Sequence, residues 1–255
     1  MSTDAARIFV VGMGEVGRRL GSALTAAGVE VVPVTRTSGW KEAVADPEGV
    51  LVVCVREEAL PEVVGCLEGV SPQRLVFVQN GWIRPLLANL PGCSRGLVWF
   101  TSKGDFFRVL RPSVFSGAKA EFLATALGRG GVPSAAVGEN AFASAEAEKM
   151  GFNCVVGLPL AVHQASLGEY LDRHREEAEI VFGEAVAVTS RAVGTTRSAR
   201  WWGDFLNAAE PIAWVRASTA KALEYRNGAV LRLAHEFGLP APVNQRLLDA
   251  VGFRG

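Results

Sequence analysis

Two side chains able to do chemistry lie four positions apart in an otherwise apolar stretch. Lys149 and Asn153 belong to "EKMGFNCVVGLPLAVHQA" (148–165), whose apolar spacing is typical of a helix. Residues four apart share one face of a helix, so the ammonium and the carboxamide would face the same way. An ammonium can protonate and stabilise an oxygen that gains negative charge during a reaction. The alternative is a surface lysine whose stem lies along the helix, since Glu146 and Glu148 indicate a solvated helix start.

A second candidate site lies near the N-terminus, in "VVGMGEVGRRL" (10–20). Its glycines have G-x-G-x-x-G spacing, follow a buried strand and open a helix, which is the context that dinucleotide-binding motifs require. The first glycine allows a tight turn, the second lets a pyrophosphate approach the backbone, and the third lets helix and strand pack closely. The helix N-terminus offers N–H groups and a positive dipole to the phosphates. A glycine-rich turn of another α/β protein is the alternative. We predict a dinucleotide site that includes Gly12, Met13, Gly14, Glu15, Val16 and Gly17.

The end of the second predicted strand, in "VVPVTRTSGW" (31–40), bears on the choice of cofactor. NAD sites usually carry a carboxylate there for the ribose hydroxyls. This chain instead has Thr35 and Arg36, followed by Thr37 and Ser38. An arginine among hydroxyls can neutralise and bind a 2′-phosphate, which favours NADP. The alternative is an ordinary solvated arginine in a loop.

Asn80 follows the fourth predicted strand in "FVQNGW" (77–82). Asn-Gly is common in hairpin turns, but the residues that follow look helical rather than strand-like. In an open α/β sheet, loops at the carboxyl ends of the strands line the ligand crevice. Asn80 is therefore a candidate to contact a nicotinamide ribose or a substrate, and a simple turn is the alternative.

The elements that must position these residues change character along the chain. The first part alternates apolar strands with helices and contains an aromatic hairpin at 96–117, centred on Lys103-Gly104-Asp105. After about residue 140 the pattern is helical. We predict an α/β protein: a Rossmann-type parallel sheet domain (1–139) and an all-helical substrate or catalytic domain (140–255). The predicted helices of the second domain are 144–167, 171–193, 202–236 (with a break near Ser218) and 243–251.

Composition excludes several classes of protein. The 255 residues contain 26 Lys plus Arg and 26 Asp plus Glu without long runs of one sign, so no nucleic-acid partner is expected. The four cysteines form no CxxC or Cys/His cluster, which predicts reduced core thiols and no metal site. The N-terminus has no signal-peptide pattern, and no apolar run is long enough to span a bilayer. We therefore expect a soluble cytoplasmic protein without membrane contact.

Four segments, in order, resemble the ketopantoate reductases (2-dehydropantoate 2-reductases). They are "GMGEVG", "QNG", "EKMGFNCVVGLPL" and "EYRNGAVLRLAHEFGLPAPVN". The resemblance covers nearly the whole chain, and the last two segments are the more specific.

The resemblance implies an NADPH-dependent reductase of the pantothenate pathway that converts a 2-keto acid, most like 2-dehydropantoate, into a 2-hydroxy acid. Lys149 matches the family's general acid. Asn153, Asn80 and Ser218 match residues that bind substrate, and Asn80 also lies near the nicotinamide in the family. Arg56 stands where the family has a lysine, at the cofactor site. A homodimer is left open, because Trp201, Trp202 and Trp214 fit either a core or a dimer surface.

The chain also departs from the family pattern around the substrate. Gly157 and Leu158 replace an asparagine and a proline, the segment after Ser218 is shorter, and the family's ribose-binding glutamate falls on Ala222, with Glu224 close by. Two alternatives therefore stay open: a reductase of the same fold acting on another carbonyl or an imine, and a non-catalytic NADP-binding module.

Overall fold

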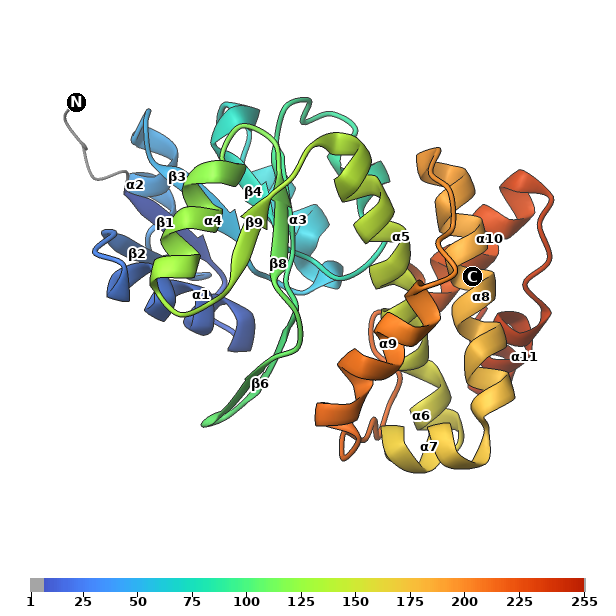
Figure 1. Ribbon diagram of the computed structural model, residues 1–255. Coiled ribbons are helices and arrows are strands. Elements are labelled where there is room, and N and C mark those ends of the chain that lie inside the picture. Colours follow the sequence, from blue (N-terminus) through green and yellow to red (C-terminus); the bar gives the residue numbers. More distant parts are fainter. Residues whose placement is uncertain (1–6, 255) are drawn as a thin grey trace. The chain divides into compact units, whose positions relative to one another are not determined.

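The structure, a computed structural model, describes residues 7–254 and divides into two compact units (Figure 1). The sheet unit comprises the residues up to Gln79 together with Ile83–Phe142. The helical unit comprises Asn80–Trp82 together with the residues from Ala143 onward. The short segment with Asn80 therefore belongs to the helical unit, although it directly follows a strand of the sheet.

A seven-stranded sheet organises the sheet unit, in the order β2-β1-β3-β4-β5-β8-β9. Neighbouring strands from β2 to β5 are parallel, β8 is antiparallel to β5, and β9 is parallel to β8. The strands are β1 (Ile8–Val11), β2 (Val31–Val34), β3 (Val50–Val53), β4 (Leu75–Phe77), β5 (Ser94–Leu97), β8 (Ser113–Ser116) and β9 (Ser134–Ala136). The predicted fold class is confirmed, with one antiparallel pairing inside the mostly parallel sheet.

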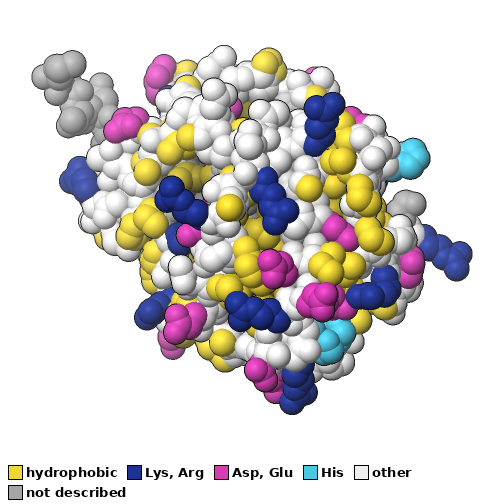
Figure 2. All heavy atoms as spheres, turned by 45° about the vertical axis from the view of Figure 1, so that its right-hand side comes forward, with side chains coloured by type: hydrophobic (Ala, Val, Ile, Leu, Met, Phe, Trp, Pro, Cys, Tyr) yellow, Lys and Arg dark blue, Asp and Glu magenta, His cyan; other side chains and the backbone are white. Residues whose placement is uncertain are grey.

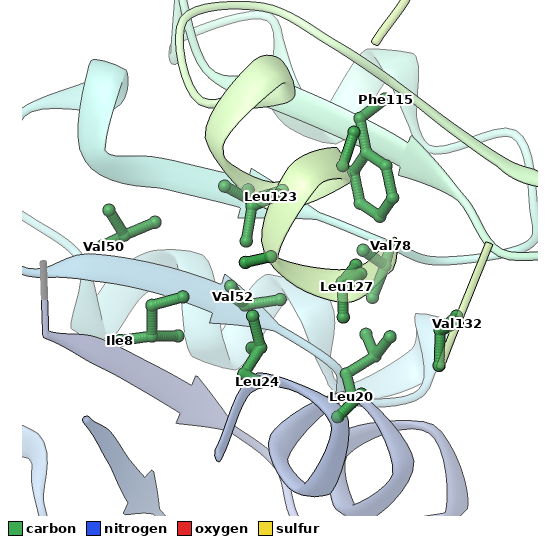
Figure 3. Close-up of a cluster of buried hydrophobic side chains, with 14 of the residues drawn as sticks. Ile8, Leu20, Leu24, Val50, Val52, Val78, Phe115, Leu123, Leu127 and Val132 are labelled. Carbon is green, nitrogen blue, oxygen red and sulfur yellow. The ribbon is translucent and has the colours of Figure 1, made fainter. Parts of the chain in front are cut away.

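Both faces of the central strands are covered, which explains their uniformly apolar sequences. Every residue of β1, β3 and β4 is buried. On one face, Leu20 and Leu24 meet Leu123 and Leu127 above the strands (Figure 3). These leucines come from the two helices α1 (Glu15–Ala26) and α4 (Ala120–Arg129). Burying apolar area of this kind is the main stabilising contribution to such a sheet. The other helices of this unit are α2 (Trp40–Ala45) and α3 (Leu60–Cys66).

The predicted hairpin is present but shorter than the aromatic segment that suggested it. Strands β6 (Phe100–Lys103) and β7 (Phe106–Val109) pair antiparallel around Gly104-Asp105 and project from the sheet in Figure 1. The flanking apolar residues belong instead to β5 and β8 of the main sheet. Arg19 of α1 holds the hairpin, because its guanidinium donates to Ser102 Oγ and to the Gly104 carbonyl at 3.0 and 2.7 Å.

The helical unit is more interrupted than its sequence pattern suggested. Its helices are α5 (Glu139–Val155), α6 (Leu158–Val162), α7 (Leu167–Arg173), α8 (Arg175–Val193), α9 (Trp201–Ala209), α10 (Asn227–Phe237) and α11 (Pro242–Ala250). The helix predicted for 144–167 starts earlier, at Glu139, and ends at Val155; Gly157 then precedes the first residue of α6. The break predicted near Ser218 within 202–236 is present and longer than expected, because the chain forms turns and a loop over 213–222.

Asparagine side chains fix the C-terminal part of α5. Asn227 donates to the Cys154 carbonyl at 3.2 Å and to Asn244 Oδ1 at 2.8 Å. Both asparagines are at most 1 % exposed, so these bonds are formed away from water and satisfy a carbonyl near the helix end. Glu184 in turn accepts hydrogen bonds from Asn244. Helices α5, α8, α10 and α11 are thereby tied into one scaffold.

Lys and Arg side chains alternate with Asp and Glu on the face drawn in Figure 2. Among residues 7–254, no helix is both long and apolar enough to cross a bilayer.

The prediction of four core thiols is wrong for Cys66, which is exposed, whereas Cys154 is fully buried. Burial raises the pKa of Cys154 to about 12, so this thiol stays protonated and unreactive.

Candidate active site

The glycine turn between β1 and α1 has the geometry that its spacing predicts. Gly12 has φ +95°, a conformation that L-residues with a side chain rarely adopt. A Cβ on Gly17 would lie 1.9 Å from the Gly12 carbonyl oxygen, so only glycine fits there. A Cβ on Gly14 would meet nothing within 4 Å. Gly14 therefore leaves open space at the helix N-terminus, where a pyrophosphate could approach the backbone N–H groups.

A cavity of about 500 Å³ lies beside this turn, entirely within the sheet unit. Six residues predicted to bind the cofactor line it: Gly12, Met13, Gly14, Thr35, Arg36 and Arg56. Glu15, Val16 and Gly17 belong to α1 and do not line this cavity, and Asn80 lies in the other unit. The cavity therefore joins the glycine turn to the ends of β2 and β3.

The cavity is also lined by residues that the sequence interpretation missed. They include Trp40 at the start of α2 and one face of the segment around α3, formed by Ala59, Glu62, Val63 and Cys66. The i, i+3, i+4, i+7 spacing of these last four is the signal that could have identified them, because it marks one face of a helix. Glu62 adds a carboxylate to a cavity whose other charged lining residues are Arg36 and Arg56.

The loop after β2 is held in a tight turn. Thr35 N–H donates to the Ser38 carbonyl at 3.0 Å, and the two hydroxyls lie 2.8 Å apart. Gly39 follows with φ +86°, and a Cβ there would lie 2.8 Å from the Pro33 carbonyl oxygen. These contacts place the exposed Arg36 at the cavity and keep hydroxyl groups of Thr35 and Ser38 beside it.

Glu15 begins α1 with its carboxylate already engaged. Ser102 Oγ donates to it at 3.1 Å and Arg18 donates to it at 3.0 Å. The hydrogen bond from Ser102 is the main reason that the pKa of Glu15 lies below its usual value. Arg18 also donates to the Met13 carbonyl at 3.1 Å. Glu15 and Arg18 thus connect the hairpin to the glycine turn.

Lys149 and Asn153 lie on α5 in the helical unit and are 5 % and 6 % exposed. Glu146 and Glu148, which were expected at a solvated helix start, lie in the middle of α5 instead and are also buried, at 4 % and 5 %. The lysine is therefore not a surface side chain lying along the helix. A buried ammonium is costly unless its surroundings stabilise the charge. The Nζ atom of Lys149 lies 4.6 Å from the centroid of the Phe152 ring.

Asn153 and Asn80 are brought together, although 73 positions separate them. The Asn153 Nδ2 group donates to the backbone carbonyl of Asn80. Gly81 packs on Tyr225 so closely that a Cβ would lie 2.6 Å from the tyrosine Cβ, and Trp82 N–H donates to the Tyr225 carbonyl at 2.7 Å. The Asn-Gly pair therefore packs within the helical unit. Strand β4 does not continue into a hairpin.

Three further candidates belong to the segment between α9 and α10. Ser218 lies in an exposed bend of the loop 213–222. Ala222 is 8 % exposed and has φ +51°, and Glu224 is exposed. The cluster of His163, Tyr170, Glu177 and Arg246 forms a separate polar network within the helical unit. In the described part of the chain, no group of three His, Cys, Asp or Glu side chains could hold a metal ion.

The three tryptophans divide between core and surface. Trp201 is 9 % exposed and Trp202 stacks on Phe205 at 4.9 Å, so both contribute to packing. Trp214 is 49 % exposed.

Comparison with known proteins identifies the fold. No protein-family model matches the chain, and no curated protein matches it by sequence. Solved structures match over nearly the full length. A PanE/ApbA family ketopantoate reductase from Ralstonia eutropha aligns with a TM-score of 0.75 and 20 % identity, covering 96 % of this chain and 97 % of that one. The 2-dehydropantoate 2-reductase from Methylococcus capsulatus aligns with a TM-score of 0.75 and 18 % identity, covering 96 % of each chain.

A ternary structure of D-mandelate dehydrogenase with NADH and anilino(oxo)acetate is similar to the same degree. Its TM-score is 0.77 at 14 % identity, with 96 % of this chain and 97 % of that chain covered. The protein therefore has the two-unit fold of the ketopantoate reductases, and the predicted resemblance is confirmed at the level of the fold. D-mandelate dehydrogenase, a protein named for a different substrate, has the same fold.

Proposed function

We propose that the protein is an NADPH-dependent reductase that converts a 2-keto acid into a 2-hydroxy acid, most like 2-dehydropantoate into pantoate. The observation that carries this proposal is a lysine only 5 % exposed, one helical turn before an asparagine that hydrogen-bonds the Asn80 carbonyl. A cavity beside a glycine turn supports the cofactor half of the proposal.

The sheet unit fits a dinucleotide. Gly14 keeps the approach to the α1 N-terminus open, and Gly12 and Gly17 allow the close turn that aims the N–H groups there. Arg36, with Thr35 and Ser38 beside it, would bind a 2′-phosphate by charge-assisted hydrogen bonds. Arg56 lines the same cavity and adds a second positive charge for phosphate groups. Met13, Glu15 and Val16 complete the turn, with the Glu15 carboxylate held by Ser102 and Arg18.

The helical unit would supply the groups that act on the substrate. When bound, NADPH supplies a hydride to the carbonyl carbon of a 2-keto acid. Lys149 donates a proton to the carbonyl oxygen, and its positive charge stabilises the alkoxide that would otherwise form. Asn153 and Asn80 orient the substrate, and the hydrogen bond from the Asn153 side chain to the Asn80 backbone carbonyl fixes the segment that carries Asn80. Ser218 binds the substrate carboxylate if its loop folds over the ligand. The products are a 2-hydroxy acid and NADP⁺.

A second candidate is a reductase of the same fold that acts on a different carbonyl or on an imine. Two observations favour it. By the resemblance, Gly157, which lies just after the end of α5, stands where the ketopantoate reductases have an asparagine, and Ala222 replaces a ribose-binding glutamate whose hydrogen bond it cannot form. These changes would affect the substrate pocket and the edge of the cofactor site, and they leave the glycine turn intact.

The test is oxidation of NADPH by purified protein with 2-dehydropantoate and a panel of other substrates, including phenylglyoxylate, pyruvate and cyclic imines. Turnover of 2-dehydropantoate supports the first candidate. Turnover of another panel member alone supports the second. Tight NADPH binding without turnover of any substrate would reject both and leave a non-catalytic NADP-binding module.

A further inference from the structure

Lys149 lies against the end of a chain of aromatic rings within the helical unit. Its Nζ atom is 4.6 Å from the centroid of Phe152, one helical turn further along α5. The Phe152 ring is held edge-on by Phe205 of α9, with centroids 5.7 Å apart and planes at 66°. Phe205 stacks on Trp202 at 4.9 Å, and both contact Phe182 of α8. Phe152 is 6 % exposed, so its orientation is fixed by packing rather than by solvent.

We propose that Phe152 is a positioning residue for Lys149: its ring face holds the ammonium in place and keeps it protonated in a buried site. This inference rests on the proposed function only where it takes Lys149 to be the proton donor. The effect on the lysine itself does not depend on that function.

The physical need for such a partner follows from burial. Removing an ammonium from water favours its neutral form and lowers its pKa. A neutral amine could neither donate the proton nor stabilise an alkoxide at neutral pH. The negative face of an aromatic ring within about 6 Å of a cation offsets part of this desolvation, most strongly when the pair is shielded from water. The ring face stabilises the charge of the ammonium without competing for its N–H groups as a hydrogen-bond acceptor would.

Other charged groups lie on α5 and on the elements around it. Glu146 and Glu148 are buried on α5 itself, and Asp204 lies on α9 next to Phe205. Arg226 lies near the far end of α5, where its charge acts on Cys154. The carboxylate of Glu184 on α8 is engaged by Asn244. A test of the ring must therefore leave all of these charges unchanged.

Replacement of Phe152 by phenylalanines with one, two and three ring fluorines meets this requirement. Fluorination withdraws electron density from the ring face in steps while nearly preserving its size. The matched control is the same series at Phe182, which is 1 % exposed in the same aromatic cluster and contacts Phe205 and Trp202. Thermal unfolding of every variant establishes that the fold is retained.

The measurement is the pKa of Lys149, followed by NMR on protein whose lysines carry ¹³C-methyl groups. The chain has only five lysines, and the signal of Lys149 is the one lost in Lys149→Arg. We expect the pKa of Lys149 to fall with each added fluorine at position 152, by about 0.5 to 1 unit over the series. The series at Phe182 should leave it unchanged.

The proposal is overturned if fluorination at 152 leaves the pKa of Lys149 unchanged, or if fluorination at 182 shifts it equally. If a substrate is turned over, the alkaline limb of kcat should move to lower pH by the same amount, because activity requires the protonated lysine. Absence of turnover would reject the proposed function but leave the titration result valid. A titration without any shift would reject the role of Phe152 even in an active enzyme.

Discussion

The two units present their candidate site residues in different ways. In the sheet unit, the site is a cavity beside one continuous segment, residues 12–17. The backbone of this segment requires glycine at Gly12 and Gly17. In the helical unit, it consists of side chains from separate segments: Lys149 and Asn153 on α5, and Asn80 from a short segment after β4. The first kind of site depends on local backbone geometry, and the second depends on how helices pack. The two should therefore respond differently to substitution.

The largest expected effect comes from the glycine turn. Gly14→Ala adds a methyl group where nothing lies within 4 Å, so the fold should be unaffected. The methyl group should instead obstruct the phosphates and weaken NADPH binding roughly a hundredfold. Titration of NADPH by fluorescence, together with thermal unfolding, measures both quantities.

Gly17→Ala is the matched control for that prediction. Its methyl group would lie 1.9 Å from a backbone oxygen, so both NADPH binding and Tm should fall. Unchanged NADPH affinity in Gly14→Ala would show that the phosphates do not bind at this turn.

The next effect concerns Asn153 in the helical unit. Asn153→Ala removes the hydrogen bond that ties α5 to the Asn80 carbonyl. We expect kcat/KM for the keto acid to fall by about tenfold or more, with NADPH affinity unchanged. Steady-state kinetics with the best substrate of the panel provides the measurement. A selective loss of NADPH binding in this variant would contradict the assignment of Asn153 to the substrate.

A smaller effect is expected from the loop after β2. Arg36→Ala removes the positive charge proposed to bind the 2′-phosphate, so Kd for NADPH should rise by about tenfold while Kd for NADH stays constant. Glu62→Gln is a control with the opposite expected effect. Removal of a carboxylate from the same cavity should lower Kd for NADPH relative to Kd for NADH. An equal loss of both cofactors in Arg36→Ala would reject the NADP assignment.

The smallest effect concerns the anchoring of the loop that carries Ser218. Glu169 accepts hydrogen bonds from the Ser166 N–H and hydroxyl, which, together with Arg216, lower its pKa to about 2. Because the folded-state pKa is lowered, the stabilisation is complete above the unfolded value near 4.3 and is lost as the pH falls toward 2. Glu169→Gln should lower Tm by a few degrees at pH 7. The difference from the parent protein should shrink between pH 4.5 and pH 2 in thermal unfolding curves. A difference that is constant over this range would contradict the proposed ionisation.

The sequence was most informative where local geometry decides the structure. The glycine spacing predicted the turn at Gly12, and the buried strands predicted the parallel sheet, because both depend on neighbouring residues. The Asn153–Asn80 contact and the buried state of Glu146 and Glu148 could not be derived in this way. Glutamates are rarely buried, and the true start of α5 at Glu139 places these two in the middle of the helix, where the packing of the folded chain buries them.

The same limit explains the errors in the helical unit. The apolar pattern continues through Gly157, so the periodicity predicted one helix where the chain forms two, and the break expected near Ser218 extends over 213–222. Gly157 adopts a backbone conformation outside the helical region, and Ala222 has a positive φ that local propensity does not predict. Trp40 and Glu62 were missed because their place in the cavity depends on how α2 and α3 lie against the glycine turn.

The most direct test of the central claim is the rate of hydride transfer in Lys149→Met, a substitution that keeps much of the side-chain volume and removes the ammonium. Single-turnover oxidation of bound NADPH by the best keto acid substrate should slow by about a hundredfold or more, while Kd for NADPH and Tm stay close to those of the parent protein. A rate within about twofold of the parent protein, at full NADPH occupancy, would contradict a proton-donating role for Lys149.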